Sequence, residues 1–232
     1  DAAPGLVLLG REGELVVSAV KLDRAAFEGA HHALHRLVEH DADDALQDGV
    51  AELEIDEEVV NVCKEYFPQT ASSFDDPRVK LFFEDGLRFV RSKKNEYDLI
   101  LVDSTDPVGP GEGLFTREFY GNCYTALTDS GILVNQHESP YYDFNAVAMQ
   151  RAHRRIREKF PIAQVYQAHI PTYPSGYWLF GFASKKFDPI KDLDAGKWNE
   201  LKLKTKYYNT ELHLGCFALP NYVKELLNDG TQ

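Results

Sequence analysis

Short apolar runs alternate with segments of helical spacing along most of this chain. Runs that predict strands lie at residues 53–55, 79–83, 97–103, 132–136, 165–170 and 177–184. Segments that predict helices lie at residues 57–66, 86–93, 116–127, 145–160 and through much of 192–229. The apolar run at 99–102 is continuous, as in a strand buried on both faces. Such alternation is typical of a parallel sheet covered by helices on both faces.

The last two predicted strands are joined by the short segment 171–176, which contains Pro and Gly and predicts an antiparallel hairpin. The expected fold is therefore α/β, with a mostly parallel sheet that ends in a C-terminal hairpin. In such sheets ligands bind at the carboxyl ends of the strands. This rule selects the strand ends at 54–56, 84–86, 103–106 and 136–139 as candidate site positions.

The first 50 residues have a different pattern. A strand is expected at 5–10, a weak turn at Gly10 and Gly13, and a helix-like segment rich in Ala and His at 27–40. We therefore expect an atypical N-terminal segment at 1–50 and one α/β domain at 51–232. His31 and His35 have the spacing of a helical metal-ligand pair, but no carboxylate or cysteine partner has matching spacing. A surface helix is favoured there, and no metal site is predicted.

The charge of the chain limits its partners. The 232 residues include 25 Lys and Arg against 37 Asp and Glu, a formal net charge of −12. This balance disfavours nucleic acid and favours cationic ligands. No apolar run approaches the ~20 residues that span a bilayer, so no membrane association is expected. Cys63, Cys123 and Cys216 are isolated, which is typical of reduced thiols in a cytoplasmic protein.

Two strand ends have the chemistry to bind a nucleoside. Glu54 has the position of an acid that accepts hydrogen bonds from a ribose diol; the alternative is a solvated charge in an acidic run. Asp85 can accept from an exocyclic adenine amine, and Gly86 allows close approach of the backbone. The alternative for Asp85 is simple capping of the helix that follows.

A third strand end carries two acids three residues apart. Asp103 and Asp106 leave a buried strand and enter a Pro/Gly loop, an arrangement that can hold an amine and take its proton. The alternative is capping within a loop. The segment 107–114 is interpreted as a lid or a plain connector. Tyr173 lies in a rigid turn. One interpretation is that its hydroxyl points into a cleft; the alternative is that its ring packs at the hairpin tip.

Seven motifs together resemble the spermidine synthase family of polyamine aminopropyltransferases. They are EIDEEVV (54–60), DDPRV (75–79), EDG (84–86), YDLILVDSTDPVGPGEGLF (97–115), NQHESPYY (135–142), IPTYPSG (170–176) and KYYNTELH (206–213). The resemblance covers residues 52 to 229 almost continuously. It implies a Rossmann-like fold of the class I methyltransferase type over 51–232.

The resemblance also implies a reaction. An aminopropyl group passes from decarboxylated S-adenosylmethionine, a co-substrate, to putrescine, giving spermidine and 5′-methylthioadenosine with no cofactor and no metal. The resemblance assigns Asp103 as the catalytic acid/base. It assigns the donor nucleoside to Glu54, Asp85, Gly86 and Pro110, and the acceptor to Asp103, Ser104, Thr105, Asp106, Gln136 and Tyr173. It further implies a cytoplasmic homodimer or homotetramer.

One family feature has no match here. The family carries a glycine-rich loop after its first strand, and the nearest segment is LGREGE at 9–14, which has only two glycines. Three hypotheses follow: an active aminopropyltransferase; a catalytically impaired homologue acting as a binding or oligomerisation subunit; and a methyltransferase of the same fold. The paired acids favour a polyamine acceptor over the neutral acceptor of a methyltransferase.

Overall fold

The computed structural model of the chain describes residues 15–20, 50–54, 56–77, 79–104, 109–171, 173–203 and 205–229. Its centre is a seven-stranded sheet in the order β3-β2-β1-β4-β5-β7-β6. The strands are β1 Leu15–Val20, β2 Val50–Glu54, β3 Val79–Phe83, β4 Tyr97–Ser104, β5 Leu127–Glu138, β6 Ile162–His169 and β7 Tyr177–Ser184. The strands predicted at 53–55 and 132–136 are both longer than expected.

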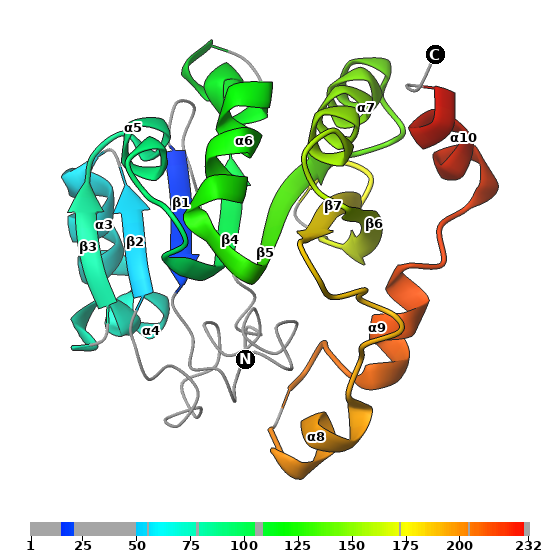
Figure 1. Cartoon of the computed structure of the whole chain (residues 1–232). Helices are drawn as coiled ribbons and strands as arrows, with labels where there is room; N and C mark the ends of the chain where they lie inside the picture. Colours follow the sequence, from blue (N-terminus) through cyan, green and yellow to red (C-terminus); the bar gives the residue numbers. More distant parts are fainter. Residues whose placement is uncertain are drawn as a thin grey trace.

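The strand directions confirm the expected mixed sheet. β2 and β3 pair in parallel, as do β4 and β5, whereas β7 is antiparallel to both β5 and β6. β1 is antiparallel to its two neighbours, β2 and β4. Five strands therefore run in one direction, and β1 and β7 run in the other (Figure 1). The C-terminal hairpin is confirmed as β6 and β7.

The reversed central strand β1 has no counterpart in the sequence predictions. Leu15 lies opposite Ser104, the last residue of β4, and Val20 lies opposite both Val50 and Leu99. The chain therefore enters β1 at the edge where β2 and β4 end, and leaves β1 at the opposite edge. The strand expected at 5–10 and the helix-like segment at 27–40 lie outside the described residues.

The described helices include α3 Glu57–Tyr66, α4 Pro68–Ala71, α5 Gly86–Arg91, α6 Arg117–Ala126, α7 Asp143–Arg157, α8 Ala195–Glu200, α9 Thr210–Cys216 and α10 Asn221–Asp229, with 3₁₀ helices η1 Ser72–Asp75 and η2 Gly109–Phe115. Side-chain caps set several starts. The Asp56 Oδ1 atom accepts from the Glu58 amide at 3.0 Å before α3, and the Thr116 hydroxyl accepts from the Phe119 amide at 3.1 Å before α6. These caps satisfy amides that a helix start leaves without partners.

The apolar run of β4 is buried on both faces, as its continuity predicted. Ile100 and Val102 belong to the core cluster that lies under α5, α6 and α7. Leu99 and the partly buried Leu101 pack in a second cluster on the other face, together with Phe217 beyond α9. Figure 1 shows α5 and α6 in front of the sheet and α3 behind it. Successive β4 side chains therefore enter two different cores.

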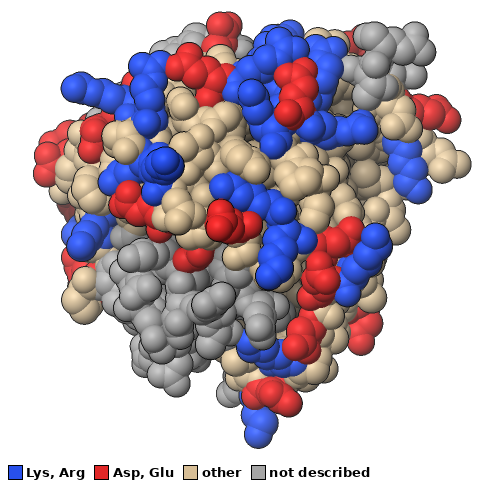
Figure 2. Space-filling model, in the orientation of Figure 1, with Lys and Arg blue, Asp and Glu red and all other residues tan. Residues whose placement is uncertain are grey.

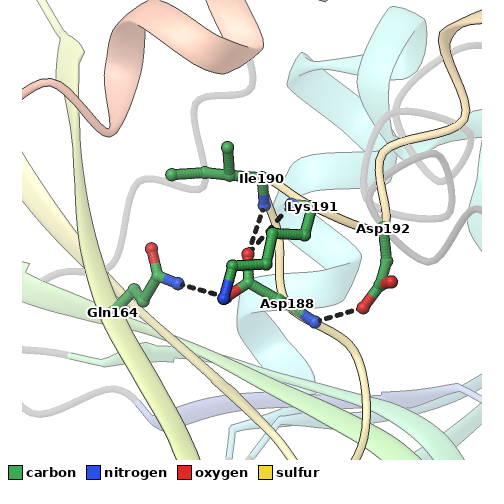
Figure 3. A network of polar contacts seen from close by, with 5 residues as sticks. All are labelled: Gln164, Asp188, Ile190, Lys191 and Asp192. Atoms are coloured by element: carbon green, nitrogen blue, oxygen red, sulfur yellow. Dashed lines mark hydrogen bonds and ion pairs between the residues drawn. The ribbon is translucent and has the colours of Figure 1, made fainter.

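A network of hydrogen bonds connects residues 188–192, which follow β7, to Gln164 of β6 (Figure 3). The Asp188 Oδ1 atom accepts from the amides of Ile190 and Lys191 at 3.0 and 2.9 Å, and Gln164 Nε2 donates to Asp188 Oδ2 at 3.2 Å. The Asp192 carboxylate in turn accepts from the Asp188 amide at 2.7 Å. Gln164 lies near the amino end of β6, so this network stabilises the edge opposite to the predicted site.

The later part of the segment 107–114, interpreted as a lid or a plain connector, lies in η2 and is packed against the core. Leu114 and Phe115 are buried in the core cluster under α6, and Arg155 donates a hydrogen bond to the Phe115 carbonyl. A Cβ atom at Gly113 would lie only 2.4 Å from a methyl group of Leu87. That glycine therefore permits close packing between η2 and α5 rather than a hinge. Residues 105–108 lie outside the described residues.

Candidate active site

Three predicted site residues lie along one edge of the sheet. Glu54, Asp103 and Gln136 occur where β2, β4 and β5 end, and these strands all run in the same direction. In the parallel β4–β5 ladder, Val102 lies opposite Asn135, which aligns Asp103 with Gln136. The sheet thus brings together residues that are more than 30 positions apart in the chain.

The side chains of these three residues also point to the same face of the sheet. Leu53 and Val102, which precede the two acids, are buried in the cluster under α5, α6 and α7, so the acids point to the other face. Gln136 comes two positions after Val134, which is buried in the cluster on that other face. A ligand on this side of the edge therefore meets two carboxylates and one amide.

Asp103 has the electrostatics of a general base. Burial at the end of β4 raises the pKa of its carboxyl group from 3.8 to about 6. Desolvation disfavours the charged form, which makes the carboxylate more basic than one in water. A pKa near 6 leaves most of the group ionised at neutral pH, and it can still take a proton during a reaction.

The nucleoside candidates have distinct local environments. Glu54 is only 4% exposed, and its Oε1 atom accepts from the Asp56 amide at 3.1 Å. The alternative of a solvated charge is therefore wrong for Glu54. The exposed Asp85 caps α5 by accepting from the Leu87 amide at 2.8 Å, which is the structural role considered for it. The cap uses one carboxylate oxygen of Asp85, and Gly86 beside it is buried.

Four further candidates lie at the end of β4 or in the segment after it. Ser104 is the last residue of β4, and Pro110 lies in η2. Thr105 and Asp106 lie outside the described residues, so their predicted roles stay predictions. Thr105 and Asp106 come between the end of β4 at Ser104 and the start of η2 at Gly109.

Tyr173 lies in a tight turn between β6 and β7. Its amide donates to the Ile170 carbonyl and its carbonyl accepts from the Gly176 amide, both at 3.0 Å. Ser175 and Gly176 have φ values of 70° and 64°, so the turn needs two left-handed residues. The half-buried Tyr173 ring packs edge-on against Trp178, with 4.7 Å between ring centroids. The rigid turn and the packed ring are therefore both present.

The structure adds Glu138, within the strand end 136–139, to the candidate residues. A β-bulge interrupts the β5–β7 ladder: Gln136 lies opposite Phe180, whereas Glu138 lies opposite the next residue, Leu179. Glu138 is fully buried and has a φ of 113°, and the Asn145 side-chain amide of α7 donates to its Oε2 atom. Such a backbone costs about 1–3 kcal/mol and is concentrated at functional sites. Apart from its position at a strand end, no local sequence signal marks this residue.

Buried polar groups lie below the bulge, facing α7. The Nδ1 atom of His137 accepts from the side-chain Nδ2 atom of Asn135 at 3.0 Å, and its ring lies edge-on to His153 of α7. Burial, and then the proximity of His153, lower the pKa of His137 well below 6.5. Burial also lowers the pKa of His153 to about 4. Both rings are therefore neutral at neutral pH and serve as packing groups.

One face of the molecule carries charges of both signs. On the face drawn in Figure 2, Lys and Arg side chains alternate with Asp and Glu. Within the described part of the chain, no group of three or more His, Cys, Asp or Glu side chains is placed to hold a metal ion. No described helix is both long and apolar enough to cross a bilayer.

Comparison with known proteins decides the family. The spermine/spermidine synthase domain matches residues 27–194, which is more than half of the chain. The chain belongs to the spermine/spermidine synthase family. The family match begins at residue 27, inside the segment that the sequence analysis set apart. It also includes the strand ends that carry Glu54, Asp103 and Gln136.

Curated members of the spermine/spermidine synthase family are close in sequence. The polyamine aminopropyltransferase of Alkaliphilus oremlandii is 73% identical over 175 residues, which is 75% of this chain and 62% of that protein. The polyamine aminopropyltransferase of Clostridium perfringens is also 73% identical, over 177 residues, again 62% of its length. The chain therefore spans about three fifths of the length of these relatives.

Solved structures of spermidine synthases confirm the fold. One, in complex with the transition-state analogue AdoDATO, superposes with a TM-score of 0.76 at 40% identity, covering 88% of this chain and 67% of that one. The enzyme from Thermotoga maritima superposes with a TM-score of 0.68 at 41% identity, covering 76% and 58%. The predicted family and the Rossmann-like α/β class are both confirmed.

Proposed function

We propose that this chain carries the reaction centre of a polyamine aminopropyltransferase. The donor is decarboxylated S-adenosylmethionine, the acceptor is putrescine, and the products are spermidine and 5′-methylthioadenosine. The observation that carries this proposal is the desolvated Asp103 carboxylate, whose pKa is raised to about 6 at the ligand edge of the sheet. Its alignment with Gln136 and its shared face with Glu54 support the assignment.

The chemistry needs one proton transfer and one substitution. An acceptor amine in water is protonated, with a pKa of about 10.4, and has no lone pair until a proton leaves. Asp103 takes that proton as the amine nitrogen attacks the propyl carbon bonded to sulfur. The carbon–sulfur bond breaks, and its electron pair stays on the sulfur of methylthioadenosine. The positive sulfur already activates this carbon, so we propose transfer without a metal or cofactor.

The two substrates divide the site between them. On the donor side, we assign the ribose diol to Glu54, the adenine to Asp85 and Gly86, and a wall of the nucleoside pocket to Pro110. On the acceptor side, we assign Asp103, Ser104, Thr105, Asp106, Gln136 and Tyr173. Alignment of the amine with the carbon–sulfur bond supplies much of the remaining rate.

The proposal also covers the oligomeric state and the cellular compartment of the enzyme. We propose a homodimer or homotetramer in the cytoplasm, where the free thiols of Cys63, Cys123 and Cys216 stay reduced. Equilibrium sedimentation of the purified chain tests the assembly; a monomer at micromolar concentration contradicts it.

The decisive experiment replaces Asp103. The variant Asp103→Asn keeps the shape and removes the base, so turnover of radiolabelled donor with putrescine should fall about 10²–10⁴-fold. Methylthioadenosine affinity, measured by calorimetry, should change little. Turnover equal to that of the unmodified chain overturns the mechanism.

A second function has one supporting observation. Because β1 is antiparallel to its neighbours, its last residue, Val20, lies at the edge opposite to Asp103. The family's glycine-rich turn follows the first strand, so this arrangement favours the binding or oligomerisation subunit as the alternative. Stoichiometric donor binding without turnover identifies that subunit, whereas methylthioadenosine formation with putrescine identifies the enzyme.

A further inference from the structure

Large apolar side chains gather on the outer side of α7, near its start. Tyr141 and Tyr142 come directly before the helix, and Phe144 and Val147 lie in its first two turns; all four are exposed. Phe144 and Val147 are three positions apart, so they lie on the same side of the helix. These four residues and the exposed Tyr222 are called the α7 patch below.

The helix α10 contributes to the same surface. Tyr222 lies in the first turn of α10, which packs beside α7 (Figure 1). Its ring stacks on that of Tyr141, with 6.0 Å between centroids and 19° between planes. Tyr141 also packs against Tyr177 of β7. Because these rings already hold one another, binding on the α7 patch immobilises few side chains and costs little entropy.

The exposed aromatic area suits a protein interface of standard size. Tyr141, Tyr142, Phe144 and Tyr222 expose 57%, 46%, 61% and 38% of their surfaces. Together this equals about two whole aromatic side chains, or about 300–500 Å². A standard interface buries about 800 Å² on each partner, of which a little more than half is apolar. The α7 patch therefore supplies most of the apolar surface that one side of such an interface needs.

Two charges of opposite sign lie beside the α7 patch. Asp143 and Arg151 are both exposed on α7. Within the part of the chain that the structure describes, no hydrogen bond or ion pair uses either side chain. They are eight positions apart, about 12 Å along the helix, which is too far for them to pair with each other. A partner that fits this surface brings a base to Asp143 and an acid to Arg151.

A second copy of α7, running in the opposite direction, meets both requirements. When Phe144 lies opposite the partner subunit's Val147, two-fold symmetry repeats this contact on the other side of the axis. The partner's Arg151 then lies three residues, about 4.5 Å along the helix, from the position opposite Asp143. Packed helix axes are about 8–10 Å apart, so a long Arg side chain spans this offset. The symmetric pair contains this ion pair twice.

We propose that the α7 patch is the interface between two copies of this chain, which pack α7 against α7 in antiparallel orientation around a two-fold axis. The inference rests on the assembly included in the proposed function and names the surface that forms it. Ala152 and Ile156 of α7 belong to the core cluster on the face of the sheet from which Asp103 points away. This interface therefore leaves the proposed reaction centre open.

The first test removes the apolar centre of the interface. Sedimentation equilibrium of the full chain measures the Kd of the dimer. Phe144→Ser should raise this Kd about 100-fold, because each dimer loses two apolar contacts, each worth about tenfold. The melting temperature should stay almost unchanged, since the side chain is exposed.

A matched control lies on the other face of the sheet. Tyr66 of α3 is 65% exposed, and Figure 1 shows α3 behind the sheet. Tyr66→Ser removes a similar exposed ring and should change the dimer Kd less than about threefold. Equal weakening by Tyr66→Ser and Phe144→Ser overturns the proposal.

A charge reversal tests the antiparallel arrangement. Asp143→Arg and Arg151→Asp should each raise the dimer Kd, because each places like charges opposite one another at two symmetric positions. The double variant should bring the Kd back to within about threefold of that of the unmodified chain. Since the two residues cannot pair within one helix, such a rescue arises only between subunits. A double variant as weak as the single ones overturns the arrangement.

The outcomes separate this inference from the proposed reaction. If the unmodified chain is a monomer at micromolar concentration, the interface falls together with the proposed assembly. If the chain assembles and Phe144→Ser assembles equally well, only the role of the α7 patch falls. A chain that dimerises through the α7 patch but makes no methylthioadenosine from the donor and putrescine leaves the interface in place and removes the proposed activity.

Discussion

Ser139 and Ser175 are 36 residues apart in the chain, yet their hydroxyl oxygens lie 3.3 Å from each other. Ser139 follows β5 and is fully buried, whereas Ser175 lies in the turn that carries Tyr173. The Ser175 hydroxyl also donates to the Tyr177 carbonyl at 3.3 Å. This contact joins the strand end of Gln136 to the Tyr173 turn, and so connects two parts of the proposed acceptor site.

Two substitutions at Ser175 separate the hydroxyl from the backbone strain. Both Ser175→Ala and Ser175→Gly remove the hydroxyl, but only Gly accepts a φ of 70° without cost. We expect Ser175→Ala to be about 1 kcal/mol less stable than Ser175→Gly in thermal melts. Both variants should raise the putrescine KM if the contact orients the turn. An unchanged KM in both would confine Ser175 to stability.

Asp103 should lower the stability of the protein at high pH. Its pKa is raised to about 6 in the folded chain, so the unfolded chain releases this proton at a lower pH and binds fewer protons between about 4 and 6. The folded state is therefore penalised as pH rises through 6. Asp103→Asn should increase the melting temperature at pH 8 and leave it almost unchanged at pH 4. A larger gain at pH 4 contradicts the burial of the charge.

His153 should make the protein acid-sensitive. Its pKa is lowered to about 4 by burial, so the unfolded chain binds more protons from about pH 6.5 downward. Stability should fall by up to about 3 kcal/mol between pH 6.5 and 4 from this group. Urea melts of His153→Gln should show a smaller loss over that range. An equal loss in His153→Gln and the unmodified chain would contradict this role of His153.

Gly181 provides space for the polar pair beneath the bulge. A Cβ atom there would lie 2.3 Å from the His137 ring and 2.4 Å from the Asn135 Oδ1 atom. Gly181→Ala should destabilise the protein by about 1–3 kcal/mol. Gly215 in α9 has open space around it, so Gly215→Ala should be neutral or stabilising by up to about 1 kcal/mol. Equal melting temperatures for the two variants would contradict the packing.

The direction of β1 leads to a prediction for the nucleoside. The family's glycine-rich turn follows its first strand, but Val20, the last residue of β1, lies at the edge away from Asp103. We expect methylthioadenosine to bind about tenfold more weakly than in a variant with residues 1–50 replaced by a relative's strand and glycine loop, because glycines at that turn let the backbone approach the ligand closely. Calorimetry measures both affinities. Tight stoichiometric binding by the chain as written refutes the expectation.

Local signals predicted local structure well. The helix 57–66 and the strand 79–83 have the predicted bounds, because a capping Asp56, a stop at Pro68 and a short apolar run decide them at close range. The positions of Asp103, Glu54 and Gln136 at strand ends were predicted, and the parallel strands bring these ends to one edge. The Asp85 cap also followed from residue type alone.

Long-range features were not predictable. The direction of β1 is defined relative to its neighbours β2 and β4. An apolar run predicts a strand but not whether that strand pairs in parallel or antiparallel. Likewise, no Gly or Asn marks Glu138 as a residue with positive φ, because the bulge arises from pairing with β7. The packing of Leu114 and Phe115 was missed since a Pro/Gly-rich sequence looks like a loop.

The central place of β1 makes six residues responsible for the continuity of the whole sheet. If Leu15–Val20 detaches, β2 and β4 each expose a row of amides and carbonyls, and the sheet separates into a β2–β3 pair and a four-stranded remainder. Exposed strand edges recruit other chains, so partial opening at β1 would lead to aggregation before global unfolding. The contacts of β1 with β4 also join residues 79 to 89 positions apart in the chain, which places its docking late in folding. Solubility during refolding therefore depends on how fast this one strand docks.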